Sequence, residues 1–513
     1  MASNSEHHIV MLPFMAQGHL IPFLALARKL QETAAFKITI ASTPLNLQYL
    51  RSAIVAQGLE EQSCGIRLAA LPFNPADHGL PPNGENTEAL ALKDIGRLFS
   101  ASTWLESPFR DLVSEITVRE GKPPVCIISD IFMGWANRVA EGFGSVNVNF
   151  CTGGCYGYAA YVSFWVHLPH RSAKDDNGPV GAKEFSMPGF PESTRFHTSQ
   201  LHPFMRAGNG SDSWSLFFRH NLAISNSFGW LCNTVQEIEP TGFQVLRNIS
   251  KSPVWCIGPL LPPGMLKTRE SLSDLSPVSG LIGRNSGREP GLSPEKCIEW
   301  LNKHPEESVL YISFGSQNTI SPSQMMALAL GLEDTQKPFL WVIRPPIGFD
   351  TKGDFQPEWL PEGFEERMGK KGQGKLVHSW APQLEILCHR SVGAFLSHCG
   401  WNSVMESLSQ GIPLIGWPLA AEQGFNSKML MEEMGVSVEL CRGNQSSISR
   451  EEVKSVIERV LDKEEGKGKE MKNNAVKIME LIRRALKEDN GAKGSSVQAM
   501  DDFVTTILGR TNV

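Results

Sequence analysis

The sequence has 513 residues, of which 41% are hydrophobic and 20% charged, and its net charge at pH 7 is −6. This length favours two or more domains, and the composition is that of an ordinary globular protein. The acidic balance argues against nucleic acid or an anionic membrane as the main partner, because those surfaces attract proteins with an excess of basic residues.

The start of the chain and its cysteines bear on the cellular compartment. The ten cysteines are scattered and form no Cys-x-x-Cys pair, which indicates reduced and mostly buried thiols. The first residues are polar and do not form a secretory signal, and no apolar run is long enough to span a membrane. We therefore expect a cytoplasmic protein with no membrane span.

Strand-like apolar runs alternate with helical patterns along the first half of the chain. We expect strands at residues 8–14, 36–41, 125–129 and 146–150. This alternation predicts a parallel sheet with helices on both faces. His7 and His8, at the start of the first strand, are expected to be solvated.

The composition changes between the two halves of the chain. Residues 258–291 are rich in proline, glycine and serine and lack periodicity, so they are predicted to form an interdomain linker. Residues 171–195 are expected to be a second irregular stretch.

The alternation of strand and helix restarts in the second half. We expect strands at residues 309–314, 339–343, 392–397 and 412–415. Ser449 and Glu452 have the spacing of a capping box, which predicts the start of a helix. Further helices are expected at residues 469–488 and 496–508.

These patterns predict an α/β fold in which two doubly wound parallel-sheet domains face each other across a cleft. The expected divisions are an N-terminal domain (1–257), the linker (258–291), a C-terminal domain (292–490) and a C-terminal helix (491–513). Doubly wound sheets bind ligands at the carboxyl ends of their strands, where the candidate site residues fall.

A histidine and an aspartate follow two strands of the first predicted sheet. His19 comes after the first strand and Asp130 directly after residues 125–129, so both stand at the carboxyl edge of one sheet. A neutral imidazole is a suitable base for a hydroxyl group. An aspartate bonded to its other nitrogen fixes the tautomer and stabilises the protonated ring. The pair is therefore a candidate general base with its orienting acid.

The densest polar cluster lies between Trp380 and Gln423. Trp380 precedes an Ala-Pro pair and offers a flat face on which a nucleotide base can stack. The strand 392–397 leads to His398, a glycine and a helical pattern, an arrangement that suits a diphosphate at a helix N-terminus. His398 adds a donor or a charge to this place.

Other side chains of the cluster have the donors and acceptors that a nucleotide sugar requires. Asn402 and Ser403 can donate hydrogen bonds to a diphosphate. Glu406 can accept both ribose hydroxyls, and Glu422 with Gln423 suits the vicinal hydroxyls of a sugar.

The 44 residues 380–423 resemble the signature box of the plant secondary-product UDP-glycosyltransferases, which are family 1 glycosyltransferases with the GT-B fold. The residues in register with that box are Trp380, Gln383, His398, Gly400, Trp401, Asn402, Ser403, Glu406, Pro418, Glu422 and Gln423. The Gln-Gly-His-Leu-Ile-Pro context of His19 is also typical of this family.

The resemblance implies two Rossmann-like domains and an inverting transferase. Such an enzyme moves a sugar, here expected to be glucose, from a UDP-sugar to a hydroxyl of a small lipophilic acceptor such as a phenolic, flavonoid or terpenoid, and forms a β-glycoside. The UDP-sugar is a co-substrate, and no metal, other cofactor or nucleic acid is expected; the protein is expected to be a monomer. Residues 1–257 would bind the acceptor, 292–490 the UDP-sugar, and 491–513 would pack back on the N-terminal domain.

The resemblance also implies roles for single residues. His19 and Asp130 would form the catalytic pair. The implied donor-binding residues are Thr152, Ser316, Trp380, Ala381, Gln383, His398, Trp401, Asn402, Ser403, Glu406, Glu422 and Gln423. The family most often has aspartate where Glu422 stands, so the charge is kept on a longer arm. The final glutamine is associated with glucose donors.

Two other functions fit an α/β sequence of this kind. An NAD-dependent oxidoreductase needs Gly-x-Gly-x-x-Gly after its first strand, and the turn here, Phe-Met-Ala-Gln-Gly-His-Leu, lacks it. A non-catalytic UDP-sugar-binding protein would keep the fold without the chemistry, and the intact pair His19 and Asp130 argues against it.

The acceptor pocket is expected in two loops, residues 80–99 and 185–205. The second loop contains the apolar side chains Phe185, Met187, Phe190, Phe196, Phe204 and Met205. They either line an apolar acceptor pocket or pack in the core.

Overall fold

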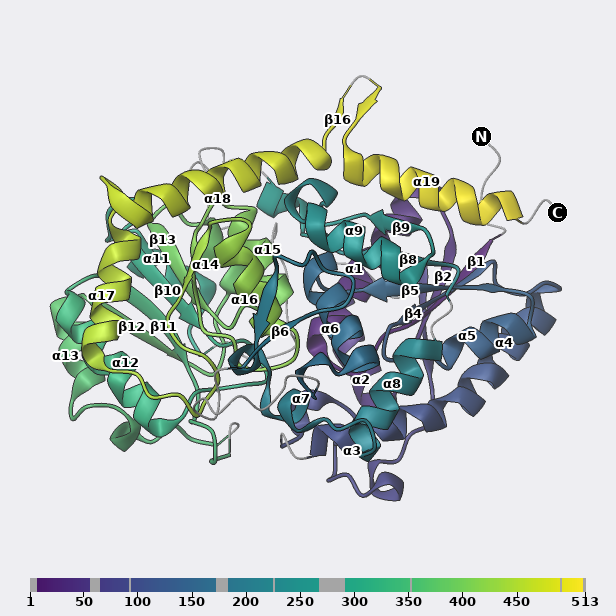
Figure 1. Ribbon diagram of the computed structural model, residues 1–513, viewed down its shortest axis with the longest axis horizontal. Helices are drawn as coiled ribbons and strands as arrows, with labels where there is room; N and C mark the ends of the chain where they lie inside the picture. Colours follow the sequence, from purple (N-terminus) through teal and green to yellow (C-terminus); the bar gives the residue numbers. More distant parts are fainter. Residues whose placement is uncertain are drawn as a thin grey trace.

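The computed structural model describes residues 7–55, 65–91, 94–171, 183–224, 227–266, 291–350, 353–489 and 491–510. Two parallel sheets with helices on both faces lie side by side, the first at the right of Figure 1 and the second at the left. The predicted class of two doubly wound domains is therefore confirmed. Residues 267–290 of the expected linker lie outside the described residues.

The first sheet has seven parallel strands in the order β3-β2-β1-β4-β5-β8-β9. The strands are β1 (His8–Leu12), β2 (Lys37–Ser42), β3 (Ile66–Ala70), β4 (Cys126–Asp130), β5 (Val146–Cys151), β8 (Gly229–Cys232) and β9 (Val254–Cys256). The helices of this part are α1 (Gln17–Ala34), α2 (Pro44–Val55), α3 (Ile95–Ala101), α4 (Glu106–Glu120), α5 (Ala136–Gly142), α6 (Cys155–His167), α7 (Pro203–Ala207), α8 (Ser213–Ile224) and α9 (Pro240–Ser250).

The second sheet has six parallel strands in the order β12-β11-β10-β13-β14-β15. The strands are β10 (Val309–Ser313), β11 (Phe339–Ile343), β12 (Gly374–His378), β13 (Val392–Ser397), β14 (Leu414–Gly416) and β15 (Ser437–Glu439). The helices are α11 (Pro294–Leu301), α12 (Pro322–Thr335), α13 (Phe364–Lys371), α14 (Gln383–Cys388), α15 (Trp401–Leu408), α16 (Gln423–Glu432), α17 (Arg450–Leu461) and α18 (Gly466–Ala485).

The central strands are buried from end to end, as in β1, β4, β10 and β13. Helices cover both faces of each sheet, so these strands are runs of apolar residues without a polar alternation. The strand order reverses between β1 and β4 in the first sheet and between β10 and β13 in the second. Such reversal points open a crevice at the carboxyl ends of the strands, which places a ligand site at each of them.

All eight strands expected from the sequence are present, and none of their ends is shifted by more than two residues. The capping box of Ser449 and Glu452 opens α17 as expected. The strands that the sequence did not reveal include β8, β9 and β15, which have only three or four residues. The expectation that 171–195 is irregular was wrong in part, because β6 (Glu184–Ser186) pairs with β7 (Arg195–His197) as a hairpin.

His8 corrects another expectation, since its side chain is buried and not solvated. Its ring nitrogens lie 2.9 Å from Glu120 and 2.8 Å from Thr39. Glu120 ends α4, far along the sequence, and shields the start of β1. His7 is partly buried.

The chain returns to the first sheet after α18. A short hairpin of β16 (Glu488–Asp489) and β17 (Ala492–Lys493) projects at the top of Figure 1, and α19 (Ser495–Gly509) follows along the first unit. Met500, Phe503 and Ile507 of α19 join the apolar core of that unit. Trp255 of β9 donates its indole N–H to Asp502 at 2.6 Å. The last described helix is therefore part of the first unit.

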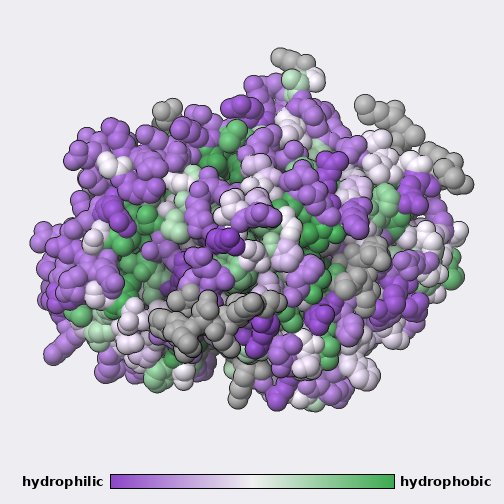
Figure 2. Space-filling view, viewed as in Figure 1, coloured by the Kyte–Doolittle hydropathy of each residue, from purple (hydrophilic) through white to green (hydrophobic). Residues whose placement is uncertain are grey.

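Polar residues cover most of the face seen in Figure 2, and hydrophobic residues appear there in small separate groups. In the part of the chain that the structure describes, no helix is both long and apolar enough to cross a membrane. Nine cysteines are described, and all are buried free thiols.

Candidate active site

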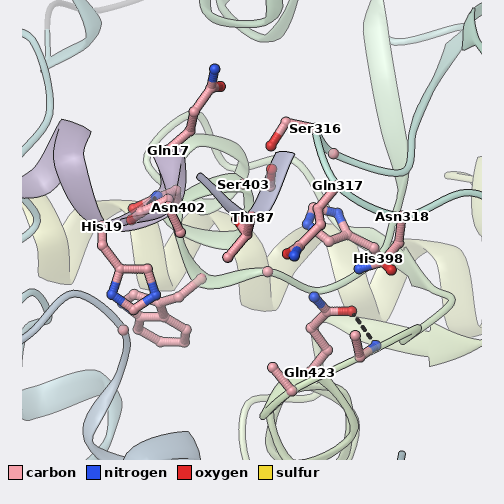
Figure 3. A pocket seen from close by; sticks show the side chains of 18 of the residues that line it. Gln17, His19, Thr87, Ser316, Gln317, Asn318, His398, Asn402, Ser403 and Gln423 are labelled. Carbon is pink, nitrogen blue, oxygen red and sulfur yellow. Dashed lines mark hydrogen bonds between the residues drawn. The ribbon is translucent and has the colours of Figure 1, made fainter. Parts of the chain in front are cut away.

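A cavity of about 380 Å³ lies between the two sheets, and residues of both units line it. Figure 3 shows His19 and Asn402 on one side of this pocket and Ser316, Gln317 and His398 on the other. Every residue of the sequence-predicted site except Asp130 lines the cavity, and Asp130 lies directly behind His19. The structure therefore brings the predicted residues of the two halves together.

His19 lies in the first turn of α1, directly after β1, and Asp130 is the last residue of β4. Nδ1 of His19 lies 2.6 Å from Oδ2 of the fully buried Asp130. The other carboxylate oxygen accepts the backbone N–H of Phe132 at 3.1 Å, which fixes its orientation. Because Nδ1–H donates to Asp130, the tautomer leaves Nε2 unprotonated and able to accept a proton.

Two opposing effects set the pKa of His19. Burial favours the neutral ring, but the charge and hydrogen bond of Asp130, together with the charge of Glu422, outweigh it. The pKa of His19 is therefore raised above the ordinary value of 6.5. A raised pKa strengthens the imidazole as a base and restricts the neutral form to higher pH.

Thr152 lies beside the pair, in the loop between β5 and α6. Its hydroxyl is 3.4 Å from Nδ1 of His19 and 3.1 Å from the hydroxyl of Tyr158. Glu239, which has no solvent exposure, binds the end of this loop where α6 begins. The Glu239 carboxylate accepts the backbone N–H groups of Cys155 and Tyr156 at 3.0 Å each, so it satisfies the first turn of α6.

Glu239 could not be found from the sequence, because it follows β8 and reaches α6 only through the fold. Thr234 also donates a hydrogen bond to its carboxylate. Burial raises the pKa of Glu239 to about 7, although these hydrogen bonds act in the opposite direction.

A hydrogen-bonded chain holds Glu406 at the second sheet. Tyr311 of β10 donates its hydroxyl to the amide oxygen of Gln383 at 3.1 Å. The amide nitrogen of Gln383 donates to Glu406 at 2.6 Å and to Ser403 at 3.0 Å. Three of the predicted donor residues are therefore one connected group, with Glu406 buried at its end.

Trp380 and Ala381 line the same end of the cavity, after β12. The residue before them, Ser379, has a φ of 71°, so the backbone turns sharply at the end of the strand. Trp380 is partly exposed, which leaves part of its ring accessible from the cavity.

His398 directly follows β13, lines the cavity and is partly buried. Burial and the nearby charge of Arg344 lower its pKa to about 4, so the ring is neutral at pH 7. The sequence left open whether His398 acts as a hydrogen-bond donor or as a charge. Because its ring is neutral, it can act as a donor. Gly315 has a φ of 76°, and a Cβ there would lie 2.7 Å from Nε2 of His398, so glycine is required.

The positive charge near His398 belongs to Arg344, a residue that was not predicted to be part of the site. It follows β11 and donates to the carbonyl oxygens of Gly315, Ser316 and Asn318 at 2.6 to 2.7 Å. These bonds hold the loop after β10, whose residues Ser316, Gln317 and Asn318 line the cavity. Its place directly after an apolar strand is the signal that could have revealed it.

Trp401 and Asn402 connect the two units. The indole N–H of Trp401 donates to the backbone oxygen of Asn233 at 2.8 Å. The side-chain amide of Asn402 donates to the backbone oxygen of Gly18 at 3.1 Å, next to His19. Asn402 therefore contacts the first unit, whereas a diphosphate was the expected partner.

Glu422 and Gln423 mark the start of α16. The side-chain oxygen of Gln423 accepts the backbone N–H groups of Leu419 and Ala420 at 2.9 Å each, and one of these bonds is drawn in Figure 3. This leaves its amide nitrogen as the group that can bind a ligand. Burial raises the pKa of Glu422, and the charge of His19 opposes this effect.

The part of the cavity that belongs to the first unit has a mostly aromatic lining, with a few polar side chains such as Gln17, Thr87 and Glu88. Its lining includes Phe14, Phe99, Phe132, Tyr161, Trp165, Phe204, Met205, Trp214 and Phe218. Phe204 and Met205 come from the predicted loop 185–205. Phe185, Met187, Phe190 and Phe196 of that loop are buried in the core, so for them packing was the correct alternative.

No three His, Cys, Asp or Glu side chains within the described ranges are grouped so that they could hold a metal ion. The cavity instead offers a base on one side and amide, hydroxyl and carboxylate groups on the other. This arrangement can bind a nucleotide with several hydroxyls beside an apolar molecule, and can remove a proton between them.

The comparisons with known proteins agree with this reading. The family model "UDP-glucoronosyl and UDP-glucosyl transferase" matches residues 277–483. UDP-glycosyltransferase 92A1 of Arabidopsis thaliana is 41% identical over 97% of this chain and 96% of its own length. Crocetin glucosyltransferase 3 of Crocus sativus is 40% identical over 91% of this chain and 93% of its own.

Solved structures show the same fold over nearly the whole chain. UGT73P12 of Glycyrrhiza uralensis, crystallised with glycyrrhetinic acid 3-O-monoglucuronide, superposes with a TM-score of 0.78 at 25% identity, covering 99% of this chain and 97% of its own. UGT71G1 of Medicago truncatula, crystallised with UDP-glucose, has a TM-score of 0.77 at 23% identity, covering 98% and 99%. The sequence relatives and the shared fold together show that this chain belongs to the plant UDP-glycosyltransferases and is a glycosyltransferase.

Proposed function

We propose that this enzyme transfers glucose from UDP-glucose to a hydroxyl of a small lipophilic acceptor, with inversion at the anomeric carbon. The observation that carries the proposal is the pair of His19 and Asp130, 2.6 Å apart, in the cavity that also holds the polar groups of the second unit. A base in this place lies between an aromatic pocket and a nucleotide site.

The names of relatives support the acceptor class. They include a crocetin glucosyltransferase, a scopoletin glucosyltransferase of Nicotiana tabacum and a flavonoid 3-O-glucosyltransferase of Fragaria ananassa. The aromatic lining of the first unit fits such molecules, because aromatic rings stack favourably on one another.

In the proposed step, Nε2 of His19 takes the proton of the acceptor hydroxyl. The acceptor oxygen then forms a bond to the anomeric carbon while the bond from that carbon to the β-phosphate oxygen breaks, and UDP leaves with the electron pair. Asp130 stabilises the imidazolium that results. Ser316, His398 and Ser403 meet the charge on the diphosphate, and Arg344 holds the loop of Ser316 from behind.

The remaining donor roles follow the same arrangement. Trp380 stacks on the uracil with Ala381 and Gln383 beside it, Glu406 binds the ribose, and Glu422, Gln423 and Thr152 bind the sugar. Trp401 lines the site, and Asn402 exchanges its bond to Gly18 for the diphosphate when the donor enters. Residues 1–257 form the acceptor-binding domain, 258–291 the linker and 292–490 the UDP-sugar domain, while 491–513 return to the first. The protein acts as a cytoplasmic monomer that uses no metal or other cofactor.

The test is UDP release and glycoside formation with UDP-glucose and a panel of phenolic, flavonoid and terpenoid acceptors. We expect acceptor-dependent UDP release and formation of a β-glucoside. The β configuration is recognised in NMR from the coupling constant of the anomeric proton. UDP that raises the melting temperature without any turnover would favour a binding protein. Failure of UDP itself to bind would overturn the assignment of the donor site.

Replacing Glu406 by alanine is expected to weaken UDP binding about 10- to 100-fold, because hydrogen bonds to a charged group are worth about 1.5–3 kcal/mol. Isothermal titration with UDP measures the change. The exposed Glu358 in the same unit serves as the control for the loss of one carboxylate. Equal UDP affinities for the two variants would remove Glu406 from the site.

Replacing Asp130 by asparagine is expected to shift the acid limb of the pH–rate profile. Transfer needs neutral His19, so the rate falls as pH drops through its raised pKa. Without the Asp130 charge this pKa falls, and the acid limb moves to lower pH while the plateau rate drops. Rates between pH 5 and 9 with a saturating donor measure both changes. An unmoved limb would show that another group sets it.

A further inference from the structure

Trp214 lies at the end of the cavity that is formed by α3 and α8. Its ring is stacked between Phe204, with centroids 5.3 Å apart, and Phe218, with centroids 5.9 Å apart. Phe218 in turn stacks on Trp165 of α6 at 4.8 Å. All four rings line the cavity, so they form one continuous aromatic wall.

Gly96 of α3 creates the space for this tryptophan. A Cβ at Gly96 would lie 1.9 Å from Cζ2 of Trp214 and 2.2 Å from Cε2, distances that no packing tolerates. The ring therefore rests directly on the backbone of α3. Any larger residue at position 96 forces Trp214 to move.

A second space lies on the far side of the same ring. It is an open surface groove of about 370 Å³, lined by His78, Gly96, Arg97, Ser100, Ala101, Trp104 and Trp214. Among the described residues, Trp214 is the one that lines both this groove and the central cavity. Trp214 is only partly buried, and its side chain separates the two spaces where both linings meet.

The groove continues the aromatic character of the cavity. The ring of Trp104 is 71% exposed, and the ring of His78 lies 5.7 Å from it. The exposed Trp104 with the partly buried His78 beside it, at the end of an aromatic cavity, fits an elongated aromatic molecule, because stacking requires flat unsaturated surfaces.

We propose that Trp214, seated on Gly96, closes the far end of the acceptor cavity and sets the length of acceptor that the enzyme takes. The groove of His78 and Trp104 would receive the distal rings of an elongated aromatic acceptor once Trp214 is removed or displaced. This inference rests on the proposed function, since it assigns the cavity beside His19 to the acceptor.

The test uses three rigid phenols of increasing length: 4-methylphenol, 4-phenylphenol and 4-hydroxy-p-terphenyl. Their dissociation constants are measured with UDP bound, and their turnover with UDP-glucose is measured in parallel. The selectivity is the ratio of the affinity for the terphenyl to the affinity for 4-methylphenol. In Trp214→Ala this ratio is expected to be at least tenfold higher than in the wild type. Trp214→Phe, which keeps an aromatic ring in the wall, is expected to lie between, and melting temperatures confirm that both variants fold.

Double variants separate a partition from a merely structural ring. Trp104→Ala is expected to leave the wild-type selectivity unchanged but to reduce the gain of Trp214→Ala, because the groove then lacks its exposed ring. Gly96→Ala is expected to change the selectivity in wild type and to have no effect in the Trp214→Ala background. Gly369→Ala is the matched control, since that helical glycine has open space around it.

Two outcomes would overturn the proposal. One is an equal loss of affinity for all three phenols in Trp214→Ala, and the other is that all three affinities stay at their wild-type values. Binding of the phenols without turnover by any variant would count against the proposed reaction, while the affinity ratios would still decide the role of Trp214.

Discussion

Replacing His19 by alanine is expected to lower the rate of sugar transfer about 10²- to 10⁴-fold, the range that general base catalysis typically contributes. The expected loss falls on kcat, because the acceptor hydroxyl keeps its proton until a base removes it. UDP affinity is expected to stay within about twofold, since the nucleotide site proposed around Glu406 lies on the other unit. Single-turnover kinetics and UDP titration measure the two quantities.

The control for this variant is His220→Ala, which removes an exposed imidazole from α8. It is expected to behave as wild type in both measurements. A His19→Ala enzyme with wild-type kcat would contradict the assignment of the base, and a combined loss of kcat and UDP binding would point to a disturbed cavity.

Replacing Glu239 by alanine is expected to lower the free energy of unfolding by about 2–5 kcal/mol. Three buried donors lose their acceptor, namely the backbone N–H groups of Cys155 and Tyr156 and the hydroxyl of Thr234. An unsatisfied buried donor costs about 1–3 kcal/mol. Urea denaturation at pH 5.5 measures the loss, and Glu237→Ala is the control, because Glu237 is exposed two residues earlier.

The effect of Glu239 is expected to depend on pH. Its pKa is about 7 in the fold against an ordinary 4.5, so folding favours the protonated form. The stability that this group contributes is complete below pH 4.5 and is lost as pH rises to 7. From pH 5.5 to 8 the wild type should lose about 2 kcal/mol that the alanine variant does not lose. Parallel pH dependences for the two proteins would contradict the burial of an ionisable group there.

The site residues that follow long apolar strands could be predicted from the sequence. His19, Asp130 and His398 each stand at or just beyond a strand that has at least five buried residues, and the carboxyl edge of a doubly wound sheet is where ligands bind. The signature box added the other donor-binding residues between Trp380 and Gln423, because their spacing is set by consecutive strands and helices of one sheet; Thr152 and Ser316 lie outside it.

The residues that were missed act through contacts between distant segments. Glu239 reaches α6 across 83 and 84 positions of the sequence, and the burial of His8 depends on Glu120, 112 positions away. Arg344 holds three carbonyl groups whose directions depend on the turn after β10. Local pattern can place Arg344 at the end of a strand, but it contains no information about these pairings, which only the assembled fold reveals.

The packing of α19 has a consequence for synthesis on the ribosome. The apolar face of Met500, Phe503 and Ile507 covers strands that are translated long before it, so the core of the first unit stays open while the whole second unit emerges. Exposed apolar surface on a waiting domain attracts chaperones and aggregates more readily. A stop codon just before Ser495 should therefore destabilise the first unit, although all of its strands are still translated, more than the second unit that directly precedes it.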